Sequence, residues 1–564
     1  MANKKTKGPK PRPVQETKPV SQKIETPVAP PVIKAPFDLR FGNKFLDNPY
    51  LPGIILFIIA LVIGMITSHD YGICWDEFYQ RRTAMVTWDY VFNHKQELLT
   101  YMDRQYGVGF ELPLIFIEKM LKLTELKDIY YMRHVVTHVF FLISAFAGYV
   151  LAFKLFRNKI IAALGFIMLA FSPRLYAHSY FNSKDIPFLC VFLITLAVAQ
   201  VAFEKDKKWL YFILGLLCGY TTGIRIMGIM LAGFILFFLF IDWIGRLSKN
   251  NKPSDGLLNM LLVSVGFCLS LYVTWPYLWT SPVDHFIESY ERMSHFFLDT
   301  KILTAGEQMP SLSLPSDYFP IWFGVTNPVL WLFVGLAGLL WALISFIQKP
   351  LSFLKNTPDR NFILYGLCFI VPIFAVISMH SVLYDDWRQL YFVYPSFVML
   401  ALFCINKIFQ SMFRWVILGA CVVQIFLIGV FMTKYHPFQQ VYFNELVSHD
   451  KEYLRKNYEL DYWGPSFKQS LDYLLAKYPG RDLKITCNPA VIDPLLNNIQ
   501  VHDSADQKRI HTLPQEKADF FIANFRFHPD DYPSNNIEHD ITVLNSTIIR
   551  IYRLRDMDTT GGKK

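Results

Sequence analysis

Cysteine, charge and cofactor-binding motifs are all scarce in this chain of 564 residues. The eight cysteines stand singly, most of them inside apolar runs, and no CxxC pair occurs, which excludes a disulfide framework and a cysteine-based metal site. The motifs GxGxxG, GxxxxGKS and HExxH are missing too, so chemistry that depends on them has no support. Charged residues make up only 18% of the chain, which leaves most of it apolar.

Apolar residues are what the chain has in abundance. Hydrophobic residues account for 53% of it and aromatic residues for 16%, and the mean hydropathy is +0.27. A soluble multidomain enzyme matches these values poorly. A polytopic membrane protein matches them well, because its lipid-facing helices are apolar all round.

The net charge of +9 is concentrated near the N-terminus and between the apolar runs. The segment 1–45 is rich in lysine and proline, begins MANKKTKGPKPRPVQ, and cannot bury enough apolar surface to fold. A basic tail of this kind is favourable beside anionic membrane lipids, and its placement argues against nucleic acid as a partner. We therefore expect a disordered cytoplasmic tail at 1–45, followed by an uncleaved anchor helix from Leu51.

Apolar runs of spanning length predict about eleven transmembrane helices within 46–433. If the basic tail is cytoplasmic, every second connection is cytoplasmic as well, and five such connections in succession carry Lys or Arg. This asymmetry predicts a cytoplasmic N-terminus and an exoplasmic C-terminus. The runs lie near 50–68, 134–153, 160–176, 186–203, 209–224, 227–244, 257–279, 328–347, 361–379, 390–406 and 415–433.

The chain after Thr433 differs in kind from the apolar runs. DYWGPSFKQSLDYLLAKYPG is typical of an amphipathic helix that ends at Pro479-Gly480. The short stretches LKITCN, DFFIANF and TIIRIYRL that follow are typical of strands bounded by polar turns. The sequence therefore predicts a small exoplasmic α/β domain at 434–564.

Carboxylates stand at the exoplasmic ends of the predicted spans, in SHDYGICWDEFYQRR (Asp76, Glu77) and SPRLYAHSYFNSKDIPF (Asp185). An acid at the edge of hydrocarbon is costly unless it faces water, so a functional role is the default interpretation. Low local dielectric raises the pKa of such an acid toward that of a general base. The alternatives are a solvated interfacial loop for Asp76 and Glu77 and a helix cap for Asp185.

Cations on the same predicted face suggest a phosphate-bearing substrate. Arg225 follows the fifth span, Arg388 lies in YDDWRQLYF, and Lys184 precedes Asp185. A guanidinium near lipid headgroups can bind phosphate in a bidentate way, whereas snorkelling to a headgroup is the alternative.

Further polar and aromatic residues are expected to line the same site. One of them, His178, is by itself more typical of a hydrogen-bonded interfacial histidine than of a metal ligand. A divalent cation bridged by Asp76 and Asp185 is another expectation, since Mg²⁺ and Mn²⁺ prefer oxygen ligands, but two acids are too few to assert it. The expected lining residues are Trp75, Tyr79, His178, Asp385 and Asp386.

Residues 50–435 resemble the GT-C superfamily of integral membrane glycosyltransferases. Within it, they are similar to bacterial relatives of the protein O-mannosyltransferases and the lipid A aminoarabinose transferase, which are glycosyltransferase family 39-like. The resemblance is carried by WDE at 75–77, KDIP at 184–187 and Arg388. In this family the first acid is the proposed catalytic base, and basic residues hold the phosphate of a polyprenyl-phosphate sugar.

The resemblance implies an inverting hexosyl or pentosyl transferase that uses a polyprenyl-phosphate sugar and an exoplasmic hydroxyl of a lipid, glycan or protein. Asp76 or Glu77 would deprotonate this hydroxyl, Asp185 would orient acceptor or base, and Arg388 would stabilise the departing phosphate with help from Arg225 or Lys184. A bacterial inner membrane and a role in cell-envelope glycan synthesis are implied as well. The alternative is a transporter or flippase of lipid-linked sugars, for which charges near mid-bilayer and at both faces are expected.

Overall fold

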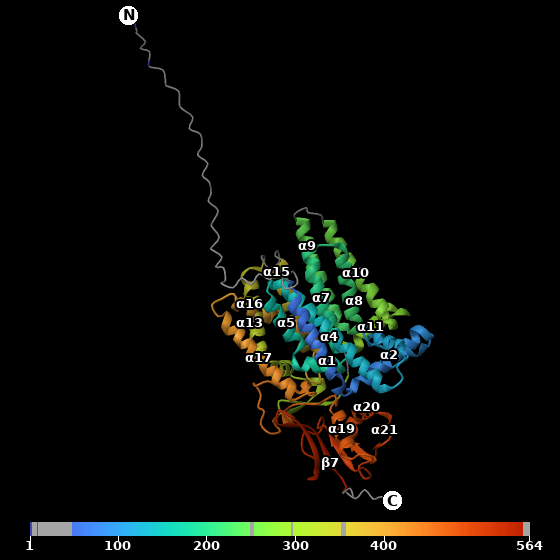
Figure 1. The fold of residues 1–564 in the computed structure, drawn as a ribbon. Coiled ribbons are helices and arrows are strands. Elements are labelled where there is room, and N and C mark those ends of the chain that lie inside the picture. Colours follow the sequence, from blue (N-terminus) through green and yellow to red (C-terminus); the bar gives the residue numbers. More distant parts are fainter. Residues whose placement is uncertain (3–7, 9–47, 249–252, 295–296, 351–356, 556–564) are drawn as a thin grey trace. The chain divides into compact units, whose positions relative to one another are not determined.

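A computed structural model describes residues 1–2, 8, 48–248, 253–294, 297–350 and 357–555. The basic tail expected at 1–45 lies, but for three positions, outside the described residues. From Pro49 onward the chain forms one compact unit (Figure 1), and this unit holds every site discussed below.

The chain is a polytopic helical membrane protein, as predicted. Each of the eleven predicted runs coincides with helix in the described residues, and nine of these helices are long and apolar enough to cross a bilayer. The nine are α1 (Leu51–Thr67), α4 (Leu126–Phe156), α7 (Asp185–Lys205), α9 (Ile229–Ser248), α10 (Pro253–Thr274), α13 (Val329–Gln348), α15 (Thr357–Ser378), α16 (Tyr394–Phe409) and α17 (Arg414–Lys434).

The other two predicted spans depart from a straight long helix. One is a pair, α5 (Lys159–Ala170) and α6 (Pro173–Phe181), whose axes differ by 56°. Pro173 explains the break, because a proline has no N–H to continue α5 but suits the first turn of α6. The other is α8 (Lys208–Ile224), which has only 17 residues. If the bent pair counts as one span, the described residues hold ten candidate crossings, and α8 accounts for the eleventh predicted run.

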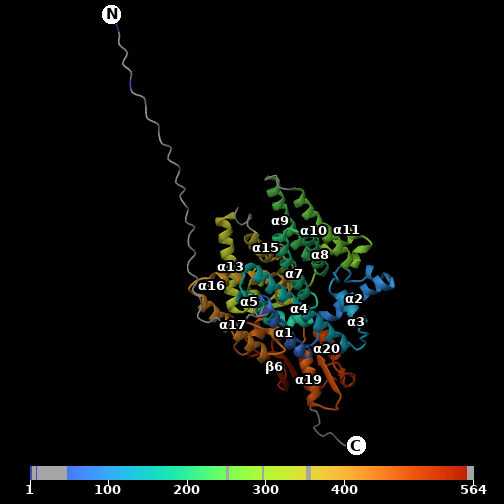
Figure 2. The ribbon, with the colours of Figure 1, turned by 45° about the horizontal axis from the view of Figure 1, so that its top comes forward.

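Shorter elements gather at the end of the bundle where α1 stops and α7 begins, which we call the sheet end because the C-terminal sheet lies there (Figures 1 and 2). They include a two-stranded hairpin, β1–β2, and four helices that are too short or too polar to be counted as spans. These elements are α2 (Trp75–Asn93), α3 (Glu111–Met120), α11 (Pro282–Ser294), β1 (Lys301–Thr304), β2 (Glu307–Pro310) and α12 (Tyr318–Thr326).

The C-terminal region contains the small α/β structure that the sequence predicts, although the boundary at 434 stays a prediction. Its five strands lie in the order β4-β3-β5-β7-β6, with β3 parallel to β4 and β5 and the last two strands antiparallel. The elements are α18 (Tyr453–Asn457), α19 (Phe467–Lys477), β3 (Leu483–Cys487), α20 (Ile492–Ile499), α21 (Ser504–Gln507), β4 (Ile510–Thr512), β5 (Phe520–Ala523), β6 (Ile537–Val543) and β7 (Ser546–Arg553).

The loop before α2 is fastened to this C-terminal region. A Cβ atom on Gly72 would lie 2.1 Å from the carbonyl oxygen of Pro465, so only glycine allows the two backbones to approach this closely. The Asn498 amide donates to the carbonyl of Ile73 at 2.9 Å and its oxygen accepts from the Ile73 N–H at 2.9 Å. Trp75 N–H donates to the Trp463 carbonyl at 3.1 Å. The first turn of α2 is therefore held by residues about four hundred positions away in the sequence.

Candidate active site

The first turn of α2 separates the two adjacent acids. Glu77 is fully buried, accepts a hydrogen bond from Cys74 N–H at 3.0 Å and lies 3.1 Å from His134 Nε2. Asp76 points elsewhere: 36% of its side chain is exposed, and its Oδ2 lies 3.8 Å from Arg388 Nη2. Consecutive helical residues point about 100° apart, which accounts for the difference. Of the two acids, Asp76 is the one that a substrate could reach.

The surroundings of Asp76 suit a general base. Although part of the side chain is accessible, the carboxylate is packed among protein atoms, and this loss of hydration raises the pKa of Asp76. Arg388 acts in the opposite direction, and the nearby Asp385 raises the pKa of Asp76 further. A carboxylate with a raised pKa accepts a proton more readily than one in water.

Asp185 joins two arginines at the N-terminus of α7. Its Oδ1 is 2.5 Å from Arg225 Nη2, and its Oδ2 is 3.3 Å from Arg388 Nη1. Asn182 donates to Oδ2 at 3.0 Å and accepts from the Asp185 backbone N–H at 2.8 Å. Only 2% of the Asp185 side chain is exposed, so its ion pairs are well shielded from water. The residue thereby positions both guanidinium groups.

Arg388 is the centre of the arrangement. Besides the two acids above, its Nη2 pairs with Asp385 Oδ2 at 3.1 Å. Its guanidinium carbon lies 4.4 Å from the ring centroid of Trp463 and 4.7 Å from that of Tyr384, within the range of cation–π contacts. Carboxylates and rings together fix the orientation of a guanidinium whose side chain is only 3% exposed.

The adjacent acids Asp385 and Asp386 belong to two different networks. Both have left-handed backbones, with φ of 55° and 62°, a conformation that aspartate adopts more readily than most residues. Asp385 contacts the Arg388 network, whereas Asp386 accepts from Arg174 at 2.8 Å and from the Tyr462 hydroxyl at 2.8 Å. Asp386 therefore lies in a neighbouring buried network.

Arg526 of the C-terminal region completes the network and was missed from the sequence. Its Nη2 donates to Asp385 Oδ1 at 2.6 Å, its Nη1 donates to the Tyr462 carbonyl, and its guanidinium lies 5.1 Å from the Trp75 ring centroid. A lone arginine in FRFHPDD carries no motif, so nothing local signals its role. We call the full set the charged cluster: Asp76, Asp185, Asp385, Arg225, Arg388 and Arg526.

Lys184 lies beside the charged cluster. Its Nζ is 3.5 Å from the ring centroid of Tyr106, and no carboxylate of the described residues lies within 4 Å of it. Burial, followed by the nearby Arg225, lowers the pKa of Lys184 to about 7. The loop that carries Tyr106 depends on Gly107, since a Cβ there would lie 2.1 Å from the Gly223 carbonyl oxygen. Lys184 is thus a desolvated cation with no acid of its own.

Four of the predicted site residues lie outside the charged cluster. Glu77 is paired with His134, and Asp386 with Arg174. Tyr79 donates to Asp493 Oδ2 at 2.9 Å, and His178 Nε2 lies 3.1 Å from the Tyr462 hydroxyl. Their placement gives no support to the expected contact with substrate. Trp75, Lys184 and the predicted acids and arginines of the cluster do lie together.

A divalent cation between Asp76 and Asp185 does not fit this arrangement. Both oxygens of Asp185 face guanidinium groups, and Arg388 also lies beside Asp76, so a cation placed there would meet positive charge. Within the described parts of the chain, no three His, Cys, Asp or Glu residues gather as metal ligands would.

A comparison with protein families confirms part of the expected resemblance. Residues 128–269, which are 142 of the 564, match the family model of dolichyl-phosphate-mannose-protein mannosyltransferases. The matched segment contains Lys184, Asp185 and Arg225 but neither Asp76 nor Arg388. No curated protein matches the chain in sequence.

Two solved structures are similar to the chain at low identity. The oligosaccharyltransferase of Archaeoglobus fulgidus in the apo form is 9% identical with a TM-score of 0.42, over 82% of this chain and 65% of that chain. This chain thus spans less than two thirds of that protein. ArnT of Cupriavidus metallidurans in the apo state is 12% identical with a TM-score of 0.44, over 89% of this chain and 98% of that chain. At these TM-scores, neither similarity carries an argument about this chain.

Proposed function

We propose that the chain is a membrane glycosyltransferase that moves one hexosyl or pentosyl unit from a polyprenyl-phosphate donor to an acceptor hydroxyl, with inversion at the anomeric carbon. One observation carries this proposal: Asp76, a partly exposed carboxylate with a raised pKa, faces the buried guanidinium of Arg388. A base and a phosphate-binding cation are what such a transfer requires. The family match over 128–269 supports a lipid-phosphate sugar as the donor.

Asp76 starts the reaction by accepting the proton of the acceptor hydroxyl. The oxygen then attacks the anomeric carbon from the side opposite the phosphate, forming the new glycosidic bond. The bond between that carbon and the phosphate oxygen breaks, and its electron pair leaves with the polyprenyl phosphate. One attack from the opposite face inverts the anomeric configuration.

The cations around Asp76 suit the departing phosphate. Below about pH 7, where Lys184 is protonated, the charged cluster and Lys184 together hold four cations and three carboxylates, which leaves an excess of one positive charge. Among the described residues, the buried Nε atoms of Arg388 and Arg225 have no hydrogen-bond partner. An unpartnered buried donor is costly, so a phosphate oxygen that accepts from it gains affinity. Asp185 and Asp385 keep the guanidinium groups in place.

The proposal also specifies the membrane and the orientation of the chain in it. The sheet end of the bundle faces the exoplasmic compartment, the N-terminus is cytoplasmic, and the membrane is a bacterial inner membrane. The distribution of Lys and Arg between alternate connections supports this orientation. The acceptor is a lipid, a glycan or a protein on the exoplasmic side.

The test is a transfer assay on the full chain in lipid nanodiscs. Undecaprenyl-phosphate hexoses and pentoses serve as donors, the matching uridine-diphosphate sugars as controls, and an extract of cell-envelope glycans and lipids as the acceptor. We expect transfer from a lipid-phosphate sugar alone, with release of undecaprenyl phosphate and an inverted anomeric signal by NMR. Transfer from the nucleotide sugars, retention of configuration, or movement of the lipid-linked sugar across a bilayer without transfer would contradict the proposal. The last of these results would favour the flippase alternative.

A further inference from the structure

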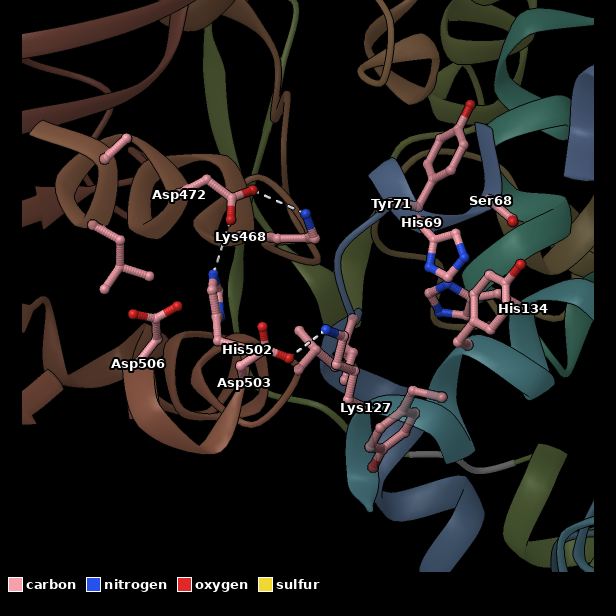
Figure 3. A pocket seen from close by; sticks show the side chains of 16 residues that line it. Ser68, His69, Tyr71, Lys127, His134, Lys468, Asp472, His502, Asp503 and Asp506 are labelled. Carbon is pink, nitrogen blue, oxygen red and sulfur yellow. Dashed lines mark hydrogen bonds and ion pairs between the residues drawn. The ribbon is translucent and has the colours of Figure 1, made fainter. Parts of the chain in front are cut away.

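A polar cavity lies between the helix bundle and the C-terminal region. Its volume is about 510 Å³, within the range of about 300–1,000 Å³ typical of small-molecule sites. One wall comes from residues 68–73, which follow α1, and from the start of α4, and the other comes from α19 and residues 501–506 (Figure 3). The cavity therefore exists only where these two parts of the chain meet.

The charges of the two walls nearly cancel. Lys127 and Asp503 form an ion pair of 2.6 Å across the cavity, and Lys468 pairs with Asp472 at 2.9 Å on one wall (Figure 3). Asp506, the remaining acid of the lining, pairs with Arg509 at 2.8 Å. Paired charges offer hydrogen-bond donors and acceptors without a strong net field. A neutral ligand rich in hydroxyl groups fits such walls better than an ion.

Aromatic groups provide the flat surface that a sugar ring requires. His69 and Tyr131 stack with ring centroids 3.5 Å apart and an angle of 12° between their planes. The C–H face of a sugar packs well on an aromatic surface while its hydroxyls bond at the edge.

The floor of this cavity adjoins the first turn of α2. The lining includes Ile73, and also His134, whose Nε2 lies 3.1 Å from Glu77. Asp76 is the next residue to Glu77, on the side of the charged cluster. The same turn thus separates the cavity from the charged cluster.

We propose that this cavity binds one neutral sugar unit of a glycan acceptor. The role as an acceptor site rests on the proposed function, whereas the binding of a sugar does not. A sugar held here would anchor a longer glycan whose reacting hydroxyl lies at Asp76. Of the three acceptor classes that the proposed function leaves open, a lipid, a glycan or a protein, this site favours a glycan.

Direct binding to the full chain in nanodiscs is the first test. The probes are free glucose, galactose, mannose and N-acetylglucosamine, measured by saturation-transfer NMR, with inorganic phosphate as a charged comparison. We expect saturable binding of at least one sugar, weakened about tenfold by Tyr131→Ala on one wall and by Lys468→Met on the other. Tyr290→Ala, at an exposed tyrosine outside the lining, is the matched control and should bind as the wild type does.

Three results would overturn the proposal: no saturable binding of any probe sugar, unchanged binding in both wall variants, or wall-dependent binding of phosphate instead of sugar. Asp76→Asn separates this inference from the proposed function, because it should lower the transfer rate by about 10²–10⁴-fold and leave sugar binding intact. If Asp76→Asn loses transfer but the wall variants bind sugar normally, the cavity proposal fails alone. If the wall variants lose sugar binding while Asp76→Asn keeps full transfer, the catalytic assignment fails and the sugar site stands.

Discussion

Substitution of Arg526 by alanine tests whether the C-terminal region is part of the charged cluster. The Arg526 side chain is 9% exposed and pairs with Asp385 Oδ1 at 2.6 Å, where Asp385 is itself only 2% exposed. Removing one partner of a buried ion pair costs about 3–5 kcal/mol, because the other charge stays buried. Arg388 still pairs with Asp385 at 3.1 Å, so we expect the lower end, about 3 kcal/mol of unfolding free energy.

The assay is urea unfolding of the purified chain in detergent, together with transfer activity of the folded fraction. Arg509→Ala is the matched control, because it removes a partly exposed pair with Asp506 and two hydrogen bonds to the carbonyls of Tyr478 and Arg481 in the same region, and it should cost about 1–2 kcal/mol. The double variant with Asp385→Ala should cost less than the sum of the two single variants, with a coupling of about 1–3 kcal/mol. Equal effects of Arg526→Ala and Arg509→Ala, or simple additivity with Asp385→Ala, would refute the reasoning.

Three further predictions concern Lys184 and its surroundings. Because burial lowers the pKa of Lys184 to about 7, the free protein loses this charge as pH rises through 7, so donor affinity should fall between about pH 7 and pH 9. Titration of the protein with a polyprenyl-phosphate sugar at several pH values measures this affinity. The same dependence of donor affinity on pH in Lys184→Met would rule the prediction out. In the unfolded chain Lys184 keeps its proton up to about pH 10.5, so the unfolded chain binds more protons than the folded one between pH 7 and pH 10.5. The free energy of unfolding should therefore rise with pH over this range. Gly107→Ala should lower unfolding free energy by about 1–3 kcal/mol and reduce transfer, because the new Cβ would lie 2.1 Å from a backbone oxygen. Gly366→Ala, which meets no atom within 4 Å, is the control, and equal melting temperatures of the two variants would contradict the expectation.

Hydropathy was sufficient to locate the membrane helices. A backbone in hydrocarbon must satisfy its own hydrogen bonds, so each apolar run of spanning length has to be helical. All eleven predicted runs are indeed helical in the described residues. The bend between α5 and α6 was not predicted, although Pro173 provides a local reason for it.

The charged cluster could be predicted only in part. Asp185 and Arg388 stood out because a carboxylate at the edge of hydrocarbon is costly unless it faces water, and because a guanidinium near lipid headgroups can bind phosphate. The sequence could not distinguish Asp76 from Glu77, since adjacent helical side chains differ in direction and the burial of Glu77 depends on His134. Arg526 could not be foreseen at all, because its contact with Asp385 joins residues 141 positions apart.

The transfer rate of Asp76→Asn, set against that of Glu77→Gln, tests the central claim most directly. Both changes replace an acid by its amide of nearly equal shape, so they differ chiefly in where the acid lies. If Asp76 is the base, Asp76→Asn should lower the single-turnover rate by about 10²–10⁴-fold, while Glu77→Gln keeps its rate within about tenfold of the wild type. Unchanged transfer in folded Asp76→Asn, or a larger loss in Glu77→Gln, would contradict the account.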